Sequence, residues 1–195
     1  MATQPNRINF KVPDWIHDFI INQDIILEIE DRMQLVIEAS RRNVIEKTGG
    51  PFAAAIFESD SGKLISLGTN LVTTQGLSIL HAEIVAITVA QNILGTYDLG
   101  RKNKPRHELV TSAEPCAMCF GAIPWSGVYR VITSARDVDV RNIGFDEGPK
   151  LDDWSSSLKK RHIDVICDIK RDEAKQVLTE YSKLGGAIYN SRESS

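Results

Sequence analysis

Three residues have the types and spacing of a metal site, and a fourth has those of a proton carrier. His81 stands two positions before Glu83, and Cys116 and Cys119 follow later in a Pro-Cys-x-x-Cys motif. One histidine and two cysteines supply three zinc ligands and leave the fourth tetrahedral position for water. Zinc lowers the pKa of such a water to roughly 7, and a nearby carboxylate can accept its proton. We therefore predict a catalytic site with one Zn²⁺ per chain, bound by His81, Cys116 and Cys119, and with Glu83 as general acid and base.

Two other uses of these residues compete with catalysis. A closed structural zinc site needs a fourth protein ligand, but the only other cysteine, Cys167, stands alone near the C-terminus. A redox Cys-x-x-Cys pair would have no need of the His-x-Glu motif. A structural site would likewise have no use for Glu83 as a proton carrier. The two motifs together, in this order, favour a zinc enzyme.

The segments that must position these residues alternate between helical and extended patterns. Apolar residues at helical spacing predict a first long helix over residues 25–46, which a Thr-Gly-Gly-Pro sequence ends. Residues 52–58 and 63–69 predict two strands that a Ser-Asp-Ser-Gly turn joins into a hairpin. Residues 80–94 are apolar nearly all round, which predicts a buried helix with His81 in its first turn.

The second half of the chain continues the alternation and places the cysteines. A short strand over residues 109–111 delivers the chain to Pro115, and a helix of about two turns starts at Ala117. Two further strands and a closing helix are expected at residues 128–133, 163–169 and 171–184. Both groups of zinc ligands then fall at helix N-termini, where free N–H groups favour the thiolate form of cysteine. We predict an α/β fold, a three-layer α/β/α sandwich around a mixed five-stranded sheet.

Length and composition are those of an ordinary globular protein. A chain of 195 residues, 42% of them hydrophobic and 25% charged, can bury one core. We expect one domain over residues 25–195, with residues 1–24 as an extension that packs on it. The net charge of −3 gives no sign of a general nucleic-acid surface. The sequence shows no signal peptide, membrane span or disulfide framework, which predicts a cytoplasmic protein.

The motifs resemble those of the cytidine/deoxycytidylate deaminase superfamily of zinc enzymes. The residues that carry the resemblance are His81-Ala82-Glu83, the run from Glu114 to Cys119, and Gly121-Ala122. Within this superfamily the chain looks most like the bacterial guanine deaminases, and the resemblance covers roughly residues 28–150. The further matches are Gly49-Gly50-Pro51-Phe52, Asn70 with Val72-Thr73-Thr74, Trp125, and Gly144-Phe145-Asp146-Glu147.

The resemblance implies a reaction and a set of substrate-binding residues. The reaction is hydrolytic deamination of a free aminated base, guanine to xanthine plus ammonia. Asn70 would anchor the base, and Phe52 and Trp125 would line the ring pocket. Glu147 would meet the amino edge of the base and serve as a second catalytic carboxylate; relatives usually carry Asp there, which leaves the substrate breadth open. The resemblance also implies a homodimer, in which Tyr189 is the candidate for an aromatic residue that closes the pocket from a swapped C-terminal segment.

Each of these roles has a plainer alternative. Asn70 follows a strand, where asparagine commonly does no more than form a turn. Phe52 and Trp125 could be core aromatics, and Glu147 in its Gly-rich loop could be a solvated carboxylate. Cys167 within an apolar strand is expected in the core. For the reaction, the alternatives are another amino-substituted ring, such as cytosine or an aminotriazine, and adenosine in tRNA.

Two basic segments, residues 101–106 and 159–161, bear on the tRNA alternative. Basic segments can mark RNA contacts, but both lie close to the starts of predicted strands, where such residues are usually solvated surface. The acidic net charge and the Gly-Phe-Asp-Glu segment also fit a free base better than an RNA. We therefore expect a small nucleobase as the substrate, with no membrane partner and no nucleic-acid partner.

Overall fold

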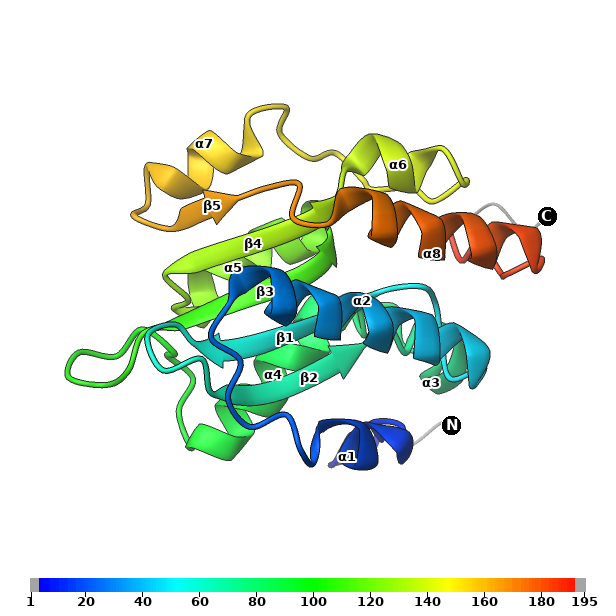
Figure 1. The fold of residues 1–195 in the computed structure, drawn as a ribbon. Coiled ribbons are helices and arrows are strands. Elements are labelled where there is room, and N and C mark those ends of the chain that lie inside the picture. Colours follow the sequence, from blue (N-terminus) through cyan, green and yellow to red (C-terminus); the bar gives the residue numbers. More distant parts are fainter. Residues whose placement is uncertain (1–3, 192–195) are drawn as a thin grey trace.

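A five-stranded sheet lies between two layers of helices in the computed structural model, which describes residues 4–191 (Figure 1). The strands are β1 (Ala53–Glu58), β2 (Leu64–Thr69), β3 (His107–Ala113), β4 (Arg130–Ala135) and β5 (Asp164–Ile166). Their order in the sheet is β2-β1-β3-β4-β5. β1 is antiparallel to both of its neighbours, whereas β3, β4 and β5 are parallel. The predicted mixed five-stranded sheet is confirmed.

Helices cover both faces of the sheet. One layer holds α1 (Trp15–Ile20), α2 (Ile29–Ile45) and α8 (Arg171–Lys183); the other holds α4 (Ala82–Leu94), α5 (Ala117–Ser126) and α7 (Trp154–Lys159). Strand β1 shows how the layers join, because Phe57 packs with the first layer and Ile56 with the second. A strand buried on both faces is apolar at nearly every position. The predicted three-layer α/β/α sandwich is therefore confirmed.

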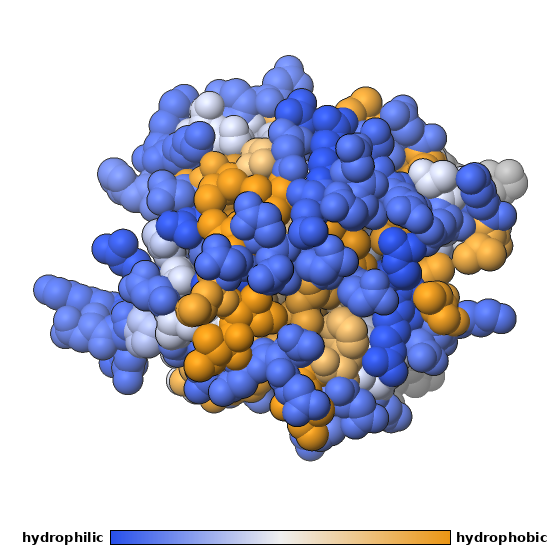
Figure 2. Space-filling view, in the orientation of Figure 1, coloured by the Kyte–Doolittle hydropathy of each residue, from blue (hydrophilic) through white to orange (hydrophobic). Residues whose placement is uncertain are grey.

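The outer surface over α2 and α8 is mainly hydrophilic (Figure 2). Within residues 4–191, no helix has the length and apolar character required to cross a bilayer.

Two short helices lie in the loops that follow strands. α3 (Val72–Gln75) follows β2, and α6 (Asp137–Arg141) follows β4. Neither these helices nor α7 were predicted, because each is too short for a helical period to show in the sequence.

The N-terminal segment packs against α2 and shortens it. α2 begins at Ile29 rather than at residue 25, because the preceding backbone pairs with the hairpin: the N–H of Ile26 donates to the carbonyl of Gly62 at 2.8 Å. In α1, the indole Nε1 of Trp15 donates to Thr48 Oγ1 at 3.0 Å, just beyond the other end of α2. The division of the chain between residues 24 and 25 remains a prediction.

Three elements near the cysteines differ in length from those predicted. β3 spans His107–Ala113 rather than residues 109–111. α5 has 10 residues rather than about two turns, because the helix continues through Pro124. β5 ends at Ile166 rather than at residue 169, because Asp168 adopts a left-handed conformation with φ of 66°. Cys167 therefore lies just outside the strand and is half-buried, in contact with the core cluster between the sheet and α7.

Candidate active site

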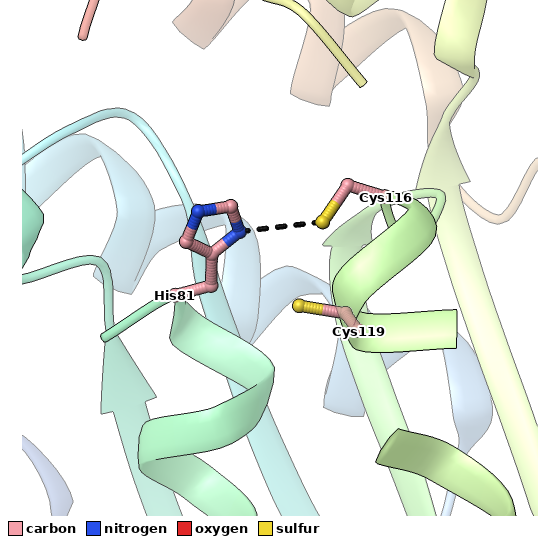
Figure 3. A group of neighbouring side chains, drawn as sticks. All are labelled: His81, Cys116 and Cys119. Atoms are coloured by element: carbon pink, nitrogen blue, oxygen red, sulfur yellow. Dashed lines mark hydrogen bonds between the residues drawn. The ribbon is translucent and has the colours of Figure 1, made fainter. Parts of the chain in front are cut away.

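The predicted zinc ligands come together at the N-termini of two helices. His81 is the N-cap of α4, Cys116 is the N-cap of α5, and Cys119 lies in the first turn of α5. Figure 3 shows the three side chains pointing toward one another. Their ligand atoms lie within 4.8 Å of one another, and His81 Nδ1 is 3.4 Å from Cys116 Sγ. Two thiols and one imidazole suit tetrahedral zinc, and no fourth protein ligand joins them within residues 4–191.

Mutual contacts and burial set the pKa values of these ligands. A hydrogen bond with Cys119 lowers the pKa of Cys116 to about 4, against the opposing effect of burial, and the contact with His81 adds to it. The same Cys116–Cys119 bond, together with burial, raises the pKa of Cys119 well above its ordinary value. Burial lowers the pKa of His81, but its contact with Cys116 and the charges nearby outweigh this and raise it. Cys116 is thus prepared as a thiolate, while metal binding must displace a proton from Cys119.

Glu83 lies in the first turn of α4, next to the proposed ligands and away from solvent. Its side chain is buried, and it lines the same cavity as His81 and Cys116. Burial, followed by the charge of Cys116, raises the pKa of this carboxyl. A carboxyl with a raised pKa can both accept and return a proton near neutral pH, as a general acid and base must.

The cavity beside the ligands has a volume of about 380 Å³, which falls within the range of small-molecule sites. It brings together most of the residues singled out in the sequence: Phe52, Asn70, Glu83, Glu147 and Tyr189. It is therefore large enough for one heterocyclic base and is lined by both carboxylates.

The backbone around Asn70 is held by a buried asparagine in α2. Asn43 Nδ2 donates to the carbonyls of Gly50, at 2.8 Å, and Asn70, at 3.0 Å. A Cβ on Gly49 would lie 1.8 Å from the carbonyl oxygen of Asn70, so only glycine fits there. Asn70 Oδ1 accepts from the N–H of Val72 at 3.2 Å, which is the expected turn contact. Its Nδ2 makes no hydrogen bond within residues 4–191, so two N–H donors remain for a ligand.

Three aromatic rings form one wall of the cavity. Phe145 meets Phe52 edge-on at 5.2 Å and Tyr189 at 4.8 Å between ring centroids. Tyr189 reaches the cavity from the C-terminal tail of its own chain. Its hydroxyl is buried without a hydrogen-bond partner in the described part of the chain. Gly50 makes room for this ring, because a Cβ there would lie 2.3 Å from the hydroxyl.

Glu147 also lines the cavity, from a loop that several contacts hold. Its side chain is 8% exposed, and its backbone carbonyl accepts from the N–H of Ala117 at 2.9 Å. Burial and the charge of Cys116 raise the pKa of Glu147 to about 8, while Lys150 acts in the opposite direction. Asn190 ties the loop to the C-terminal tail, because its Oδ1 accepts from the N–H of Asp146 and its Nδ2 donates to a loop carbonyl, both at 2.8 Å.

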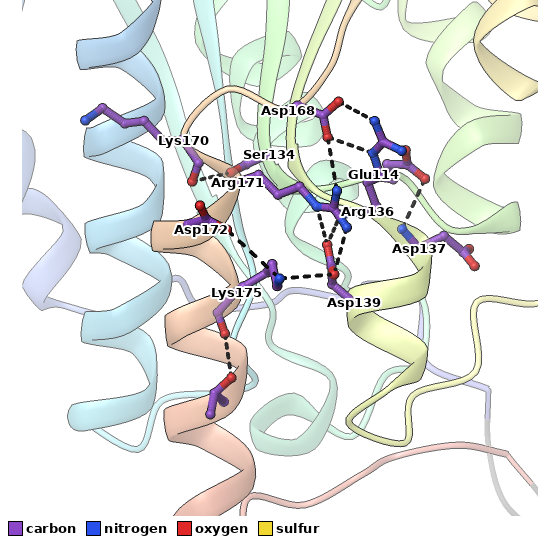
Figure 4. Close-up of polar contacts among 11 residues, drawn as sticks. Glu114, Ser134, Arg136, Asp137, Asp139, Asp168, Lys170, Arg171, Asp172 and Lys175 are labelled. Carbon is purple, nitrogen blue, oxygen red and sulfur yellow. Dashed lines mark hydrogen bonds and ion pairs between the residues drawn. The ribbon is translucent and has the colours of Figure 1, made fainter.

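An ion-pair network fixes the helix that leads into this loop (Figure 4). Arg171 at the start of α8 donates to Asp139 of α6 at 2.8 and 3.0 Å. Arg136, just before α6, donates to Asp168 at 2.7 and 2.6 Å. The N–H of Asp137 donates to the side chain of Glu114, which directly precedes the Pro-Cys motif, at 3.1 Å. The network therefore connects the loop of Glu147 to the end of the sheet and to the cysteine helix.

Trp125 does not line the cavity of its own chain, contrary to expectation. Its side chain is 84% exposed. The reason is its position on α5, where Cys119, Ile123 and Ser126 form the buried face and Trp125 points outward. The helix α4 is also less enclosed than predicted, since Ile93 is 61% exposed.

Two residues of the site, Phe145 and Asn43, have no role predicted from the sequence. Phe145 belongs to the matching segment Gly144–Glu147, and it contacts both other aromatic rings. Asn43 lies inside a predicted helix, where asparagine is itself a signal, because its side chain competes with the helix for backbone groups.

The comparison with known families agrees with this site. Residues 27–135, more than half of the chain, match the cytidine and deoxycytidylate deaminase zinc-binding region. The chain therefore belongs to this family of zinc-dependent deaminases.

Within the family, the chain is similar to guanine deaminases. The solved guanine deaminase from Nitrosomonas europaea aligns with a TM-score of 0.88 at 43% identity, over 93% of this chain and 100% of that one. A solved structure in complex with 2,6-diaminopurine aligns with a TM-score of 0.83 at 47% identity, over 90% of this chain and 94% of that one. The guanine deaminase of Bacillus subtilis (strain 168) is 41% identical over 99 residues, which are 51% of this chain and 59% of that relative. The chain thus spans somewhat over half the length of that curated relative.

Proposed function

We propose that the protein is a zinc-dependent aminohydrolase that converts guanine and water to xanthine and ammonia. The observation that carries this proposal is the buried carboxylate of Glu147 in the same cavity as Glu83 and the predicted zinc ligands. A guanine edge presents N1–H and the 2-amino group as donors, and a carboxylate accepts from both. The two donors of guanine favour the ionised form of Glu147, whose pKa burial raises to about 8, whereas cytosine and adenine present an unprotonated ring nitrogen beside the amino group, which that ionised form would repel. A site built for the donors of one base discriminates strongly against the others.

The neighbouring side chains fit the rest of the base. Asn70 offers two N–H donors to acceptor atoms of the purine. Phe52 and Phe145 offer apolar surface to the faces and edge of the ring. The similarity to a relative solved with 2,6-diaminopurine, another purine with a 2-amino group, supports a ligand of this class.

The proton transfers are assigned to Glu83. Zinc, when bound, makes water a sufficient nucleophile at neutral pH. Glu83 takes a proton from the water as the C2–O bond forms and passes it to the adjacent ring nitrogen. The second proton of the water reaches the 2-amino group, which leaves as ammonia when the C2–N bond breaks. Glu147, with its pKa raised to about 8, can hold or release a proton beside that amine.

Ammonia release across a panel of substrates tests this proposal. The panel contains guanine, 2,6-diaminopurine, cytosine, an aminotriazine, adenosine and a tRNA, with zinc and with a chelator. We expect guanine to be the preferred substrate and the chelator to abolish its turnover. Inosine in the tRNA, or turnover of cytosine but not of guanine, would contradict the proposal.

We further propose that the protein forms a homodimer and that it is located in the cytoplasm. Trp125 and Met118 on the outer side of α5, and Ile93 on the neighbouring α4, are exposed apolar side chains in the single chain. A second copy of the chain would cover them, and we place Trp125 in that interface. Tyr189 lines the cavity of its own chain, so we propose that the tail closes the pocket of its own subunit. A reducing compartment fits a site that needs both cysteines as free thiols.

A further inference from the structure

A second cavity, with a volume of about 510 Å³, lies at the far end of the sheet from the predicted zinc ligands. His107, which lines it, begins β3, whereas Ala113, which lines the catalytic cavity, ends the same strand. Seven extended residues separate the two cavities by roughly 20 Å. The lining comes from the segment before β3, the turn between α5 and β4, and the turn between α7 and β5.

The two basic segments, residues 101–106 and 159–161, which the sequence predicts as solvated surface, meet at this cavity. Lys104 and Arg106 line it from the first segment, and Arg161 lines it from the second. No acidic side chain lines it, and none of these three cations makes an ion pair within residues 4–191. The segment 101–106 projects at the left of Figure 1, and the surface there is hydrophilic in Figure 2. Positive charge is therefore concentrated on a chain whose net charge is −3.

Two carboxylates close in sequence to residues that line this cavity are already engaged. Glu108 is fully buried and pairs with Arg32 at 2.5 Å and with Arg130 at 3.3 Å. Asp98 Oδ1 accepts from the N–H of Gly100 at 2.9 Å. The cations that line the cavity thus remain available to an external anion.

A buried histidine in the lining lacks a partner on one side. His107 is 4% exposed, and its Nδ1 donates to the carbonyl of Leu99 at 2.7 Å. Its Nε2 is buried without a hydrogen-bond partner in the described part of the chain. Because Nδ1 donates to Leu99, Nε2 of the neutral ring is an acceptor, and a buried acceptor without a partner favours a ligand that donates to it.

An aromatic ring holds one of the cations in place. The guanidinium of Arg106 lies 5.3 Å from the ring centroid of Tyr129, and that of Arg130 lies 4.9 Å from it. Stacking on an aromatic face orders the guanidinium, whose planar fork of N–H donors matches phosphate oxygens. The volume of the cavity is that of a small-molecule site rather than of an extended nucleic-acid groove.

We propose that this cavity binds a small phosphate-bearing anion of the class of pyrophosphate or a nucleoside diphosphate. Arg106, Arg161 and Lys104 contact the phosphate oxygens, and Nε2 of His107, the acceptor nitrogen of a ring whose Nδ1 donates to Leu99, accepts from a protonated phosphate oxygen. This site is independent of the deaminase reaction, because guanine is uncharged and binds at the other end of the sheet.

Calorimetric titration of the zinc-loaded protein with inorganic pyrophosphate, and separately with ADP, tests the proposal at constant ionic strength. We expect saturable binding at one site per chain. The double variant Arg106→Gln/Arg161→Gln should weaken binding by about 100-fold, since each charge-assisted hydrogen bond contributes roughly a factor of ten. Arg7→Gln/Lys183→Gln, which removes the same charge elsewhere, should bind as the wild type does. If ADP binds and pyrophosphate does not, the nucleoside part provides most of the affinity, and the result would still support a binding site in this cavity.

Three results would overturn the proposal. The first is that neither probe binds at millimolar concentration. The second is that both double variants bind the probe equally well. The third is that an RNA oligonucleotide binds strongly and in a salt-dependent way, while neither small probe binds. The deaminase rate of Arg106→Gln/Arg161→Gln without added anion shows whether it is folded, and we expect that rate to be unchanged. The ring resonances of His107 provide a second readout, because they should shift on addition of pyrophosphate.

Discussion

At the scale of residues, the two buried carboxylates of the catalytic cavity have separable tasks. Glu83 is not among the three residues that can hold the metal. We expect Glu83→Gln to retain zinc and fold but to lose kcat by about 10²–10⁴-fold, because a positioned acid and base is removed. Metal analysis and ammonia release measure both quantities. A kcat above roughly a tenth of wild type would contradict this role.

Glu147 is assigned to the substrate edge, so its substitution should act on guanine specifically. Glu147→Gln keeps the size of the side chain but replaces the charged acceptor with an amide. We expect kcat/KM for guanine to fall by about 10²-fold or more, in line with the loss of a charge-assisted contact in the transition state. Asp152→Asn, an exposed carboxylate further along the chain, serves as control. Equal kcat/KM for guanine in Glu147→Gln and in the control would show that Glu147 does not contribute to the reaction.

The sequence predicted the residues whose chemistry requires a fixed spacing, and failed where position depends on a neighbour. His81, Cys116 and Cys119 were identified because a metal imposes a recognisable pattern. Trp125 belongs to a matching motif, but a motif does not state which face of a helix is buried. Phe145 could not be distinguished from a core residue until the fold brought it against other rings.

At the scale of elements, the contact between α6 and α8 should set part of the stability. Burial alone would raise the pKa of Asp139, but hydrogen bonds from Arg171 and from the backbone of Arg136 outweigh it and lower the pKa. Asp139→Asn should therefore reduce the free energy of unfolding by about 1–3 kcal/mol at pH 7. Asp172→Asn is the matched control, because that carboxylate is 96% exposed.

The same pair gives a pH dependence of defined sign. A carboxyl whose folded pKa is depressed stabilises the fold fully above its unfolded pKa of about 3.9, and this stabilisation is lost as the pH falls through the folded pKa. The difference between wild type and Asp139→Asn should therefore shrink below about pH 4 in urea unfolding series. A difference that stays constant over that range would mean that packing, not charge, holds the contact.

Long elements were predictable and short ones were not, for a physical reason. α2 and α8 show their burial as a periodic pattern over 13 or more residues, and α4 is apolar nearly all round over 13 residues. α6 has 5 residues, and Arg171 of α8, far along the chain, holds it through Asp139. A helix stabilised by such long-range contacts leaves no local signal in the sequence.

At the scale of the whole molecule, metal binding and folding should be linked. The ligands join α4 to α5, so an ion held by His81, Cys116 and Cys119 connects two helices of one layer. We expect a chelator to lower the melting temperature, and Cys116→Ser to lose zinc, because binding energy at such a site contributes to the folded state. Cys167→Ser is the matched control. Full zinc occupancy in Cys116→Ser would contradict the ligand assignment.

The exposed side of α5 should determine the oligomeric state. Trp125 is 84% exposed in the single chain, and Met118 on the same helix is 37% exposed. A large exposed aromatic residue beside other apolar side chains is typical of an interface, where it provides much of the binding free energy. Trp125→Glu should therefore shift the protein from dimer to monomer in sedimentation at micromolar concentration, because the interface would have to bury an unpaired charge. Tyr97→Glu is a useful comparison, since Tyr97 is equally exposed but lies beyond the end of α4. A wild-type protein that sediments as a monomer would contradict the proposed interface, and the role of Trp125 with it.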